Sequence, residues 1–340
     1  MKFGAIPVAE AEGAIVAHAL RAGDRSLKKG HVVTPGDQAA LRDAGVDSVI
    51  AARIEPGDVG ENEAAERLAE RLAGENLRRE RPFTGRVNIF STVNGLIVVD
   101  ADAIARINRL DEAITVATLA AHRPVAAGDM AATVKIIPFA APGVALSAAC
   151  EAVGPRGAVW VAPFRPLRVG VVSTLLPGLK ASVIAKTLRV LEARLAKSSA
   201  AIGKEERVAH EEGALAAAIE RLAPHSDALV IFGASAITDR RDVIPRAIEA
   251  SGGRIEHFGM PVDPGNLLLL AERAGAPIIG APGCARSPKE NGFDWVLDRI
   301  LAGVPITSAD IKAMGVGGLL MEIASRPQPR LGDEDRKSVV

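Results

Sequence analysis

Two acidic residues that follow a predicted strand have the chemistry of a magnesium site. Asp239 and Asp242 come after the apolar run Asp227–Phe232 and the corner Gly233–Ala236. Carboxylate oxygens in such a loop are suited to a hard divalent cation. Helix capping, combined with Asp–Arg surface pairs, is the more ordinary use of the same residues. Both interpretations place the carboxylates just before a helix that we expect to begin at Pro245.

A second loop, after residue 281, has the composition of a phosphate site. Ser287 and Glu290 fit a capping box, so a helix is expected to run on towards Leu301. Gly283 and Arg286 precede that helix. Free backbone N–H groups, the positive end of the helix dipole and a guanidinium would then meet at one anion. A well-capped helix without a ligand is the alternative.

A third loop, Gly259–Asn266, contains two glycines and two prolines, which fix its backbone and let it approach a ligand closely. Its polar members are Asp263 and Asn266. In the alternative interpretation it is a rigid turn in which Asn266 caps a helix over Leu267–Arg273.

Five further residues near expected strand ends are less specific. Ser173 and Thr174 either contact an anion or cap a loop. His210 and His257 belong to no spaced ligand set, so we interpret them as packed or solvated side chains. Cys284 has no histidine nearby in the sequence to activate it, and we assign it a structural role.

Strands that alternate with helices must position these loops. Short apolar runs predict strands, and apolar stripes of helical period predict helices between them. The alternation implies an α/β domain with a doubly wound, three-layer parallel sheet, in which the ligand lies outside the carboxyl ends of the strands. The three loops should therefore open on one edge. The expected strands are residues 168–172, 227–232, 254–258 and 276–280, and the expected helices are residues 180–197 and 211–222.

The first half of the chain is expected to be mixed and β-rich. Closely spaced turns fill residues 13–60, and an apolar stripe predicts a helix over Glu61–Ala73. The dipeptide Asn94-Gly95 predicts a hairpin between strands Val87–Phe90 and Leu96–Val99. Prolines near residue 165 suggest a boundary. We therefore expect a mixed β-rich region (1–165), an α/β domain (166–323) and a polar, disordered tail (324–340).

Composition narrows the possible partners. The 340 residues include 41 basic and 41 acidic side chains, so no overall field attracts nucleic acid or an anionic membrane. No apolar run reaches the roughly 18 residues of a membrane span, and the N-terminus lacks the pattern of a signal peptide. The two cysteines, far apart in sequence, suggest neither a disulfide nor a zinc site. We expect a cytoplasmic protein that binds neither nucleic acid nor membrane.

Residues 168–302 resemble the molybdopterin-binding domain of molybdenum cofactor biosynthesis proteins, a family that includes the molybdopterin molybdenumtransferases. The order of the corners carries the resemblance: a strand and helix from Arg168, a glycine-containing corner leading to Asp242, and the corners Pro264-Gly265 and Pro282-Gly283. Residues 29–52 also look like the small β-rich module of the long transferases, and looser similarity extends to about residue 323.

The resemblance implies molybdopterin or its nucleotide ester as ligand, molybdate as a further substrate, and a homodimer. It matches Asp242 to an acid associated with magnesium and turnover, and it matches Gly233, Ser235, Gly283 and Ser287 to contacts with the pterin and its phosphate. The full set of expected ligand contacts is Gly233, Ala234, Ser235, Ala236, Asp263, Pro282, Gly283, Arg286 and Ser287, with Asp242 as the catalytic residue and Asp242 and Asp239 holding Mg²⁺.

Three functions follow as hypotheses. The first is molybdopterin binding in cofactor biosynthesis, with magnesium-assisted insertion of molybdate into nucleotide-activated molybdopterin if the protein is an enzyme. The second is a non-catalytic carrier or sensor of the molybdenum cofactor. It is favoured because the transferases' Lys-Pro-Gly-Lys is Asp263-Pro-Gly-Asn266 here, without the two cations. The third is a nucleotide pyrophosphate hydrolase, since one fold supports several reactions.

Overall fold

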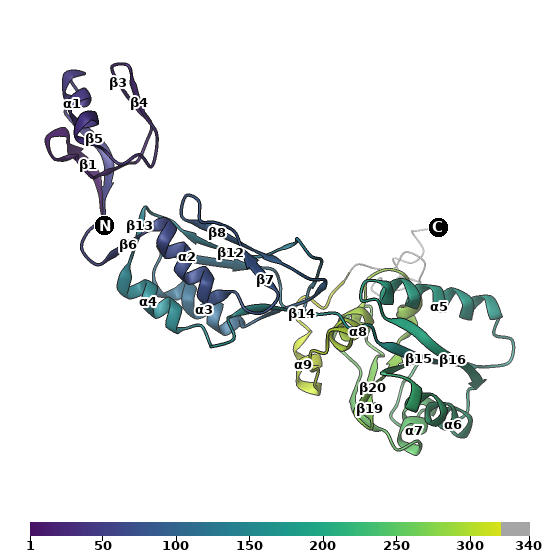
Figure 1. The fold of residues 1–340 in the computed structure, drawn as a ribbon. Helices are drawn as coiled ribbons and strands as arrows, with labels where there is room; N and C mark the ends of the chain where they lie inside the picture. The colour runs from purple at the N-terminus through teal and green to yellow at the C-terminus, as the bar shows by residue number, and fades with distance from the viewer. Residues whose placement is uncertain (321–340) are drawn as a thin grey trace, which may run out of the picture. The chain divides into compact units, whose positions relative to one another are not determined.

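The chain divides into two compact units, Met1–Ala162 and the part from Pro163 onward, in a computed structural model that describes residues 1–320 (Figure 1). The tail expected to be disordered, residues 324–340, lies outside the described residues. Among residues 1–320, no helix is both long and apolar enough to cross a membrane. Neither Cys150 nor Cys284 forms a disulfide within the described residues.

The first unit contains several small sheets and four α-helices. Its elements are β1 (Lys2–Pro7), β2 (Ile15–Val16), β3 (Leu20–Ala22), β4 (Arg25–Leu27), α1 (Pro35–Asp43), β5 (Ser48–Arg53), β6 (Asp58–Gly60), α2 (Glu61–Leu72), β7 (Leu77–Arg79), β8 (Arg86–Ser91), β9 (Gly95–Val99), α3 (Ala101–Leu110), β10 (Ile114–Thr118), β11 (Pro124–Val125), β12 (Met130–Ile136), β13 (Ala140–Pro142), α4 (Gly143–Glu151) and β14 (Val159–Pro163).

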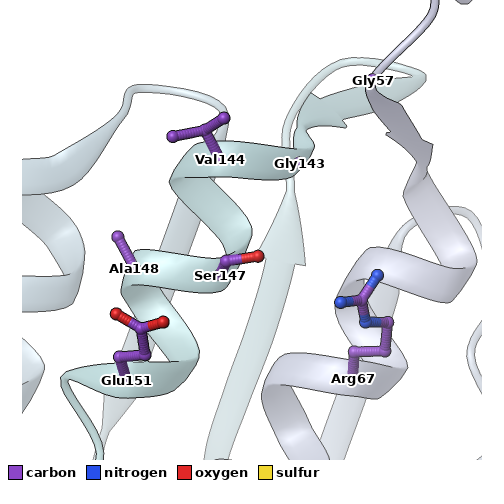
Figure 2. A pocket seen from close by; sticks show the side chains of 7 residues that line it. All are labelled: Gly57, Arg67, Gly143, Val144, Ser147, Ala148 and Glu151. Carbon is purple, nitrogen blue, oxygen red and sulfur yellow. The ribbon is translucent and has the colours of Figure 1, made fainter.

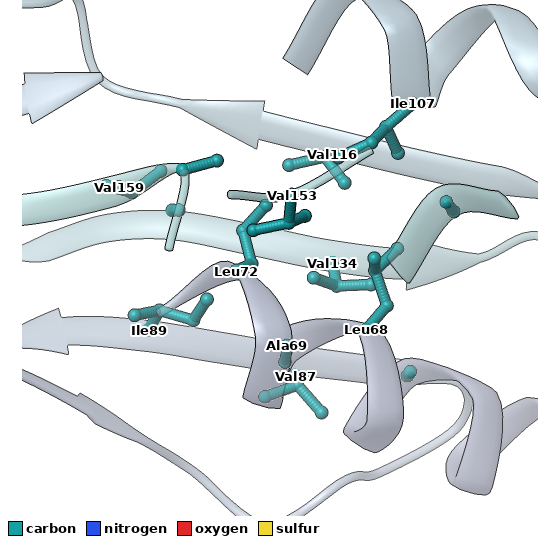
Figure 3. Packing of buried hydrophobic residues seen from close by; sticks show 14 of the residues in the cluster. Leu68, Ala69, Leu72, Val87, Ile89, Ile107, Val116, Val134, Val153 and Val159 are labelled. Atoms are coloured by element: carbon teal, nitrogen blue, oxygen red, sulfur yellow. The ribbon is translucent and has the colours of Figure 1, made fainter. Parts of the chain in front are cut away.

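The main core of the first unit lies between α2 and a four-stranded antiparallel sheet of order β10-β12-β8-β7. Strand β8 buries alternate residues, and α2 buries the stripe that contains Leu68 and Leu72, as the two periodicities require. Figure 3 shows these leucines packed against Val87 and Ile89 of β8 and Val134 of β12. The helix predicted over Glu61–Ala73 is therefore confirmed to within one residue.

The predicted hairpin around Asn94-Gly95 is wrong. Strand β8 pairs with β7 and β12, whereas β9 belongs to another sheet, of order β11-β9-β14. A tight hairpin of this kind needs positive φ at both turn residues, and neither Asn94 nor Gly95 has it. A Cβ on Gly95 would lie 2.3 Å from the carbonyl oxygen of Ala162, so this glycine permits a close strand contact instead of a turn.

The second unit is built on one six-stranded sheet of order β16-β15-β17-β20-β19-β18. Its elements are β15 (Arg168–Leu175), α5 (Ala181–Ala196), β16 (Ala201–Ala209), α6 (Glu212–Leu222), β17 (Ala228–Phe232), α7 (Val243–Ala250), β18 (Arg254–Phe258), β19 (Leu269–Arg273), β20 (Ala276–Ala281), α8 (Gly292–Ala302) and α9 (Ser308–Ala313), with short 3₁₀ turns at Ala223–His225 and Gly283–Arg286.

Helices cover both faces of this sheet, which gives the expected three layers. One core contains apolar residues of α5 and α8, and the other contains those of α6 and α7 (Figure 1). Strands β16, β15, β17 and β20 are parallel. The central run Ala228–Phe232 is buried at every position, as a strand covered on both faces requires. The α/β class and a mostly parallel sheet are therefore confirmed.

The helix expected over Leu267–Arg273 is wrong, because this segment forms the antiparallel strand β19 between β20 and β18. Leu269, Leu270 and Ala271 are all buried, so the run is a strand covered on both faces and has no polar side to turn to solvent. Ala274 and Gly275 both have positive φ and form the two-residue turn into β20. Asn266 consequently caps no helix.

A buried carboxylate in α8 makes the stability of the second unit depend on pH. Asp298 is almost wholly buried, with the ammonium of Lys197 against it. Burial raises the pKa of Asp298 from 3.8 to about 6, and Lys197 opposes this rise only in part. At pH values between 3.8 and about 6, Asp298 therefore keeps its proton in the native state and has lost it in the unfolded state.

We expect the free energy of unfolding of this unit to fall by on the order of 2 kcal/mol as the pH rises from about 4 to 6, and Asp298→Asn to abolish the fall. Denaturant unfolding at several pH values measures this through Trp295 fluorescence, in a Trp160→Phe background. Asp227 provides a control of opposite sign, because the guanidinium of Arg168 lowers its pKa. The difference in unfolding free energy between the wild type and Asp227→Asn should therefore shrink as the pH falls. Parallel pH curves for wild type and Asp298→Asn would contradict the prediction.

Candidate functional site

The loops at the carboxyl edge of the six-stranded sheet are joined to one another by hydrogen bonds. The N–H of Ala234, after β17, donates to Oγ1 of Thr174 at the end of β15, at 2.8 Å. A guanidinium N–H of Arg286, after β20, donates to the carbonyl oxygen of Gly233 at 2.7 Å. The N–H of Gly292 donates to the carbonyl oxygen of Pro264, in the loop after β18, at 2.8 Å. The predicted loops therefore meet on one edge.

Arg286 is the cation at the centre of this edge. Besides Gly233, its guanidinium contacts Oγ1 of Thr187 in α5 at 3.1 Å, and its central carbon lies 5.5 Å from the ring centroid of Phe232. Burial lowers the pKa of the Arg286 guanidinium, although an arginine stays charged at neutral pH. Within residues 1–320, no carboxylate lies within ion-pair distance of it. This half-buried, uncompensated charge is suited to an anionic ligand group.

The helix expected to begin after Ser287 begins later. Residues Gly283–Arg286 form a single 3₁₀ turn, and α8 starts at Gly292 with Asn291 as its cap. Oδ1 of Asn291 accepts from the N–H of Phe293, and Asp294 accepts from the N–H of Asn291. The capping box is therefore Asn291 with Asp294. The dipole of α8 consequently starts four residues beyond the place that we expected for the phosphate.

A buried arginine that the sequence did not single out holds this loop in place. Arg194 of α5 is 8% exposed and forms an ion pair with Asp294 at 2.6 Å. Its guanidinium also donates to the carbonyl oxygens of Ala285, Ser287 and Lys289. Its position on the apolar stripe of α5, one residue before Leu195, was the available signal, because a charged residue there must find partners in the interior.

Asp242 and Asp239 both have protein partners. Asp242 is the N-cap of α7, and its oxygens accept from the N–H groups of Val243 at 2.9 Å and Thr238 at 3.2 Å. Helix α7 begins at Val243, so Pro245 is its third residue and not its first. Asp239 is paired with Arg241 at 2.8 Å, and this hydrogen bond lowers the pKa of Asp239. Helix capping therefore describes Asp242, and an Asp–Arg surface pair describes Asp239.

Given these contacts, a magnesium ion could bind here only if groups other than the two carboxylates also served as its ligands. Among residues 1–320, no three His, Cys, Asp or Glu side chains gather as a metal cage. Mg²⁺ commonly takes one or two carboxylates and completes its shell with waters and substrate phosphates. Each oxygen of Asp242 keeps a lone pair beyond its one N–H partner. Asp242 therefore fits a cation that a bound phosphate also holds.

We expect Asp242→Asn to abolish any magnesium-dependent turnover and to leave the fold intact. The fold should survive because asparagine caps a helix as well as aspartate does. Turnover of adenylated molybdopterin with molybdate and Mg²⁺, with a thermal unfolding curve for each protein, makes the measurement. Asp242→Ala is the control for the cap and should destabilise by about 1 kcal/mol. Full activity in the asparagine variant would contradict a catalytic role.

The remaining predicted residues occupy the rim of the edge. Ser235, Ala236 and Gly283 are exposed, whereas Pro282 is buried. Asp263 is half-buried, and its backbone pairs with the segment 318–320 through Gly318 and Leu320. The structure thus brings Gly233, Ala234 and Arg286 into one hydrogen-bonded set.

A separate groove of about 530 Å³ lies in the first unit and contains none of the predicted residues. Figure 2 shows its walls: Arg67 projects from α2, and Val144, Ser147 and Glu151 project from α4. Its lining holds one arginine and one glutamate among small or apolar side chains, so it has no constellation for chemistry.

The six-stranded sheet and the helices on its two faces define an α/β protein whose loops meet at the carboxyl edge of the sheet. Residues 5–53 match a family model described as a domain of unknown function (DUF8806), which covers the first sheet and α1. No curated protein matches the chain significantly.

Solved structures of molybdenum cofactor proteins resemble the chain weakly. A molybdopterin biosynthesis MoeA protein from Pyrococcus horikosii is 14% identical, with a TM-score of 0.31, over 89% of this chain and 76% of that one. A molybdenum cofactor biosynthesis protein from Pyrococcus furiosus is 11% identical, with a TM-score of 0.25, over 92% of this chain and 65% of that one. Similarity this low does not establish an activity.

Proposed function

We propose that this protein binds molybdopterin, or its nucleotide ester, in molybdenum cofactor biosynthesis. The observation that carries the proposal is the uncompensated guanidinium of Arg286 at the carboxyl edge, 2.7 Å from the carbonyl oxygen of Gly233. It stands where an α/β sheet places its ligand, between the two loops that we assign to the pterin and its phosphate. The order of the corners along residues 168–302 supports the same ligand.

The ligand's phosphate lies against Arg286 and the turn Gly283–Arg286, and the pterin lies against Gly233–Ala236. Arg194 and Arg286 fix the two loops before the ligand arrives, which reduces the ordering cost of binding. If the protein is an enzyme, the reaction is molybdate insertion with release of the nucleotide. Mg²⁺ at Asp242, with Asp239 at the rim, would supply charge stabilisation at the phosphate.

A non-catalytic carrier or sensor is the second candidate, and a specific observation favours it. Asp242 caps α7 and Asp239 pairs with Arg241, so both carboxylates already have structural partners within the protein. Asp263 and Asn266 also supply no cation for molybdate. A carrier binds finished cofactor through the same edge without turnover.

An equilibrium titration separates these functions. The purified protein is titrated with molybdopterin and with adenylated molybdopterin, each with and without Mg²⁺. A magnesium-dependent preference for the adenylated form supports the transferase reaction. Binding of molybdopterin without that preference supports the carrier. If neither ligand binds, the proposal fails, and release of nucleoside monophosphate from dinucleotides would then identify a pyrophosphate hydrolase.

A further inference from the structure

A chain of hydrogen bonds runs along the carboxyl edge beyond the residues assigned so far. His210, which directly follows β16, has its Nδ1 2.8 Å from Oγ1 of Thr174. The same Oγ1 accepts from the N–H of Ala234 at 2.8 Å. The backbone N–H of His210 donates to the carbonyl oxygen of Leu175, so the histidine is anchored at this edge. His210 is thus one side chain away from the corner Gly233–Ala236.

The buried hydroxyl of Thr174 decides which ring nitrogen of His210 carries the proton. Thr174 is 1% exposed, and its oxygen already accepts from Ala234. Its own proton needs an acceptor, and the described part of the chain offers it Nδ1 of His210. A protonated Nδ1 would leave that hydroxyl proton buried without a partner, at the cost of an unsatisfied donor. The neutral ring therefore carries its proton on Nε2.

We propose that His210 is a neutral hydrogen-bond donor, through Nε2–H, to a ring carbonyl or ring nitrogen of the ligand's heterocycle, with Thr174 as its positioning residue. This rests on the proposed function, since it assigns the pterin end of that site. The ring of His210 is half-buried, and no partner of its Nε2 lies within residues 1–320. A donor of fixed direction beside a glycine-containing corner is suited to orienting a flat ring.

The charges around His210 favour a neutral acceptor over an anion. Glu211 and Glu212 follow it directly, and of these two only Glu212 is paired, with Arg246 at 2.7 Å. An oxyanion would meet repulsion here, whereas Arg286 has no carboxylate beside it in the described chain. The strand that ends at His210 and the strand that leads to the Arg286 turn are separated by β15 and β17, so the two ends lie roughly 14 Å apart, which is three strand spacings. A heterocycle at one end and a phosphate at the other fits this polarity.

The tautomer of His210 is the first test, and it needs no ligand. A long-range ¹H–¹⁵N correlation spectrum separates protonated from unprotonated ring nitrogens, and the signal that His210→Asn removes identifies this ring among the six histidines. We expect the proton on Nε2 in the wild type and a mixture of tautomers in Thr174→Val. Thr174→Ser, which keeps the hydroxyl, should restore the wild-type pattern. A wild-type ring protonated on Nδ1 would overturn the inference.

Two substitutions then separate the two functions of the His210 ring, the acceptor at Nδ1 and the donor at Nε2. His210→Asn keeps an acceptor near the place of Nδ1 and removes the donor. His210→Gln puts an amide N–H near the place of Nε2. We expect the asparagine variant to bind molybdopterin about three- to tenfold more weakly and the glutamine variant to bind it nearly as the wild type does. Both should bind inorganic phosphate unchanged, because phosphate occupies the Arg286 end.

The outcomes separate this inference from the proposed function. If molybdopterin binds while the His210 ring signals stay unmoved, or if His210→Asn binds it as tightly as the wild type, the inference fails and the proposed function stands. If inorganic phosphate binding weakens equally in His210→Asn, the histidine contacts an anion and the assignment to the heterocycle is wrong. If molybdopterin does not bind to the wild type, the proposed function fails and the inference falls with it.

Discussion

Replacing Arg286 by glutamine is expected to weaken binding of molybdopterin, and of inorganic phosphate, roughly 10- to 100-fold. A hydrogen bond from a charged donor contributes about 1.5 to 3 kcal/mol to binding. In the described chain no carboxylate pairs with this guanidinium, so no ion pair competes with the ligand for it. Part of the loss would come from the corner itself, because Arg286 also holds the carbonyl oxygen of Gly233. Isothermal titration of both ligands measures the effect.

Two variants distinguish the Arg286 contact from a general loss of charge. Arg189 is an exposed arginine of the same helix that carries Thr187, and it has no hydrogen bond to the described residues. Arg189→Gln should bind both ligands as the wild type does. Arg286→Lys keeps the charge but not the planar fork, so its affinity should fall between wild type and glutamine. Wild-type affinity in Arg286→Gln would remove the basis of the proposed phosphate position.

Replacing Arg194 by methionine is expected to destabilise the second unit by about 3 to 5 kcal/mol. The change preserves the apolar stem but leaves the mostly buried Asp294 without its partner, and removing one member of a buried ion pair costs about this much. The carbonyl oxygens of Ala285, Ser287 and Lys289 lose their donor as well. Denaturant unfolding followed by Trp295 fluorescence in the Trp160→Phe background measures the loss.

A double variant and a surface control test the cause. Arg194→Met combined with Asp294→Asn should recover part of the stability, because the second change removes the unpaired charge. Arg168→Gln breaks the exposed pair with Asp227 and should cost much less stability than Arg194→Met does. Equal losses in Arg168→Gln and Arg194→Met would show that burial of the pair is not what matters.

Buried strands and long amphipathic helices were predictable because their patterns are local. The run Ala228–Phe232 is wholly apolar, and α5 and α6 begin and end within one residue of expectation. The strand Leu269–Arg273 was not predictable in this way, because an apolar run of this length fits a helix or a buried strand equally well. Its strand state is set by the turn at Ala274 and by its place between β18 and β20.

The candidate site was predictable in its location and less so in its contacts. The edge follows from the parallel strands, and Arg286 and Gly233 were both expected there. Two overlapping capping patterns, Ser287 with Glu290 and Asn291 with Asp294, compete in the sequence. The second forms because Arg194 binds Asp294 from another helix. Such a partner, 100 residues away in the chain, leaves no local sign.

The antiparallel strand β19 also bears on how the sheet holds together. It joins β20 through two residues, Ala274 and Gly275, whereas the parallel strands pair only across whole helices. Closing a short loop costs little chain entropy, so this hairpin should be the first pair to form and the last to open. The turn that carries Arg286 leaves directly from β20. We therefore expect amide protons of Leu270 and Ile279 to exchange more slowly than those of the outer strand β16. The turn that carries Arg286 would then be attached to the part of the sheet that opens least often.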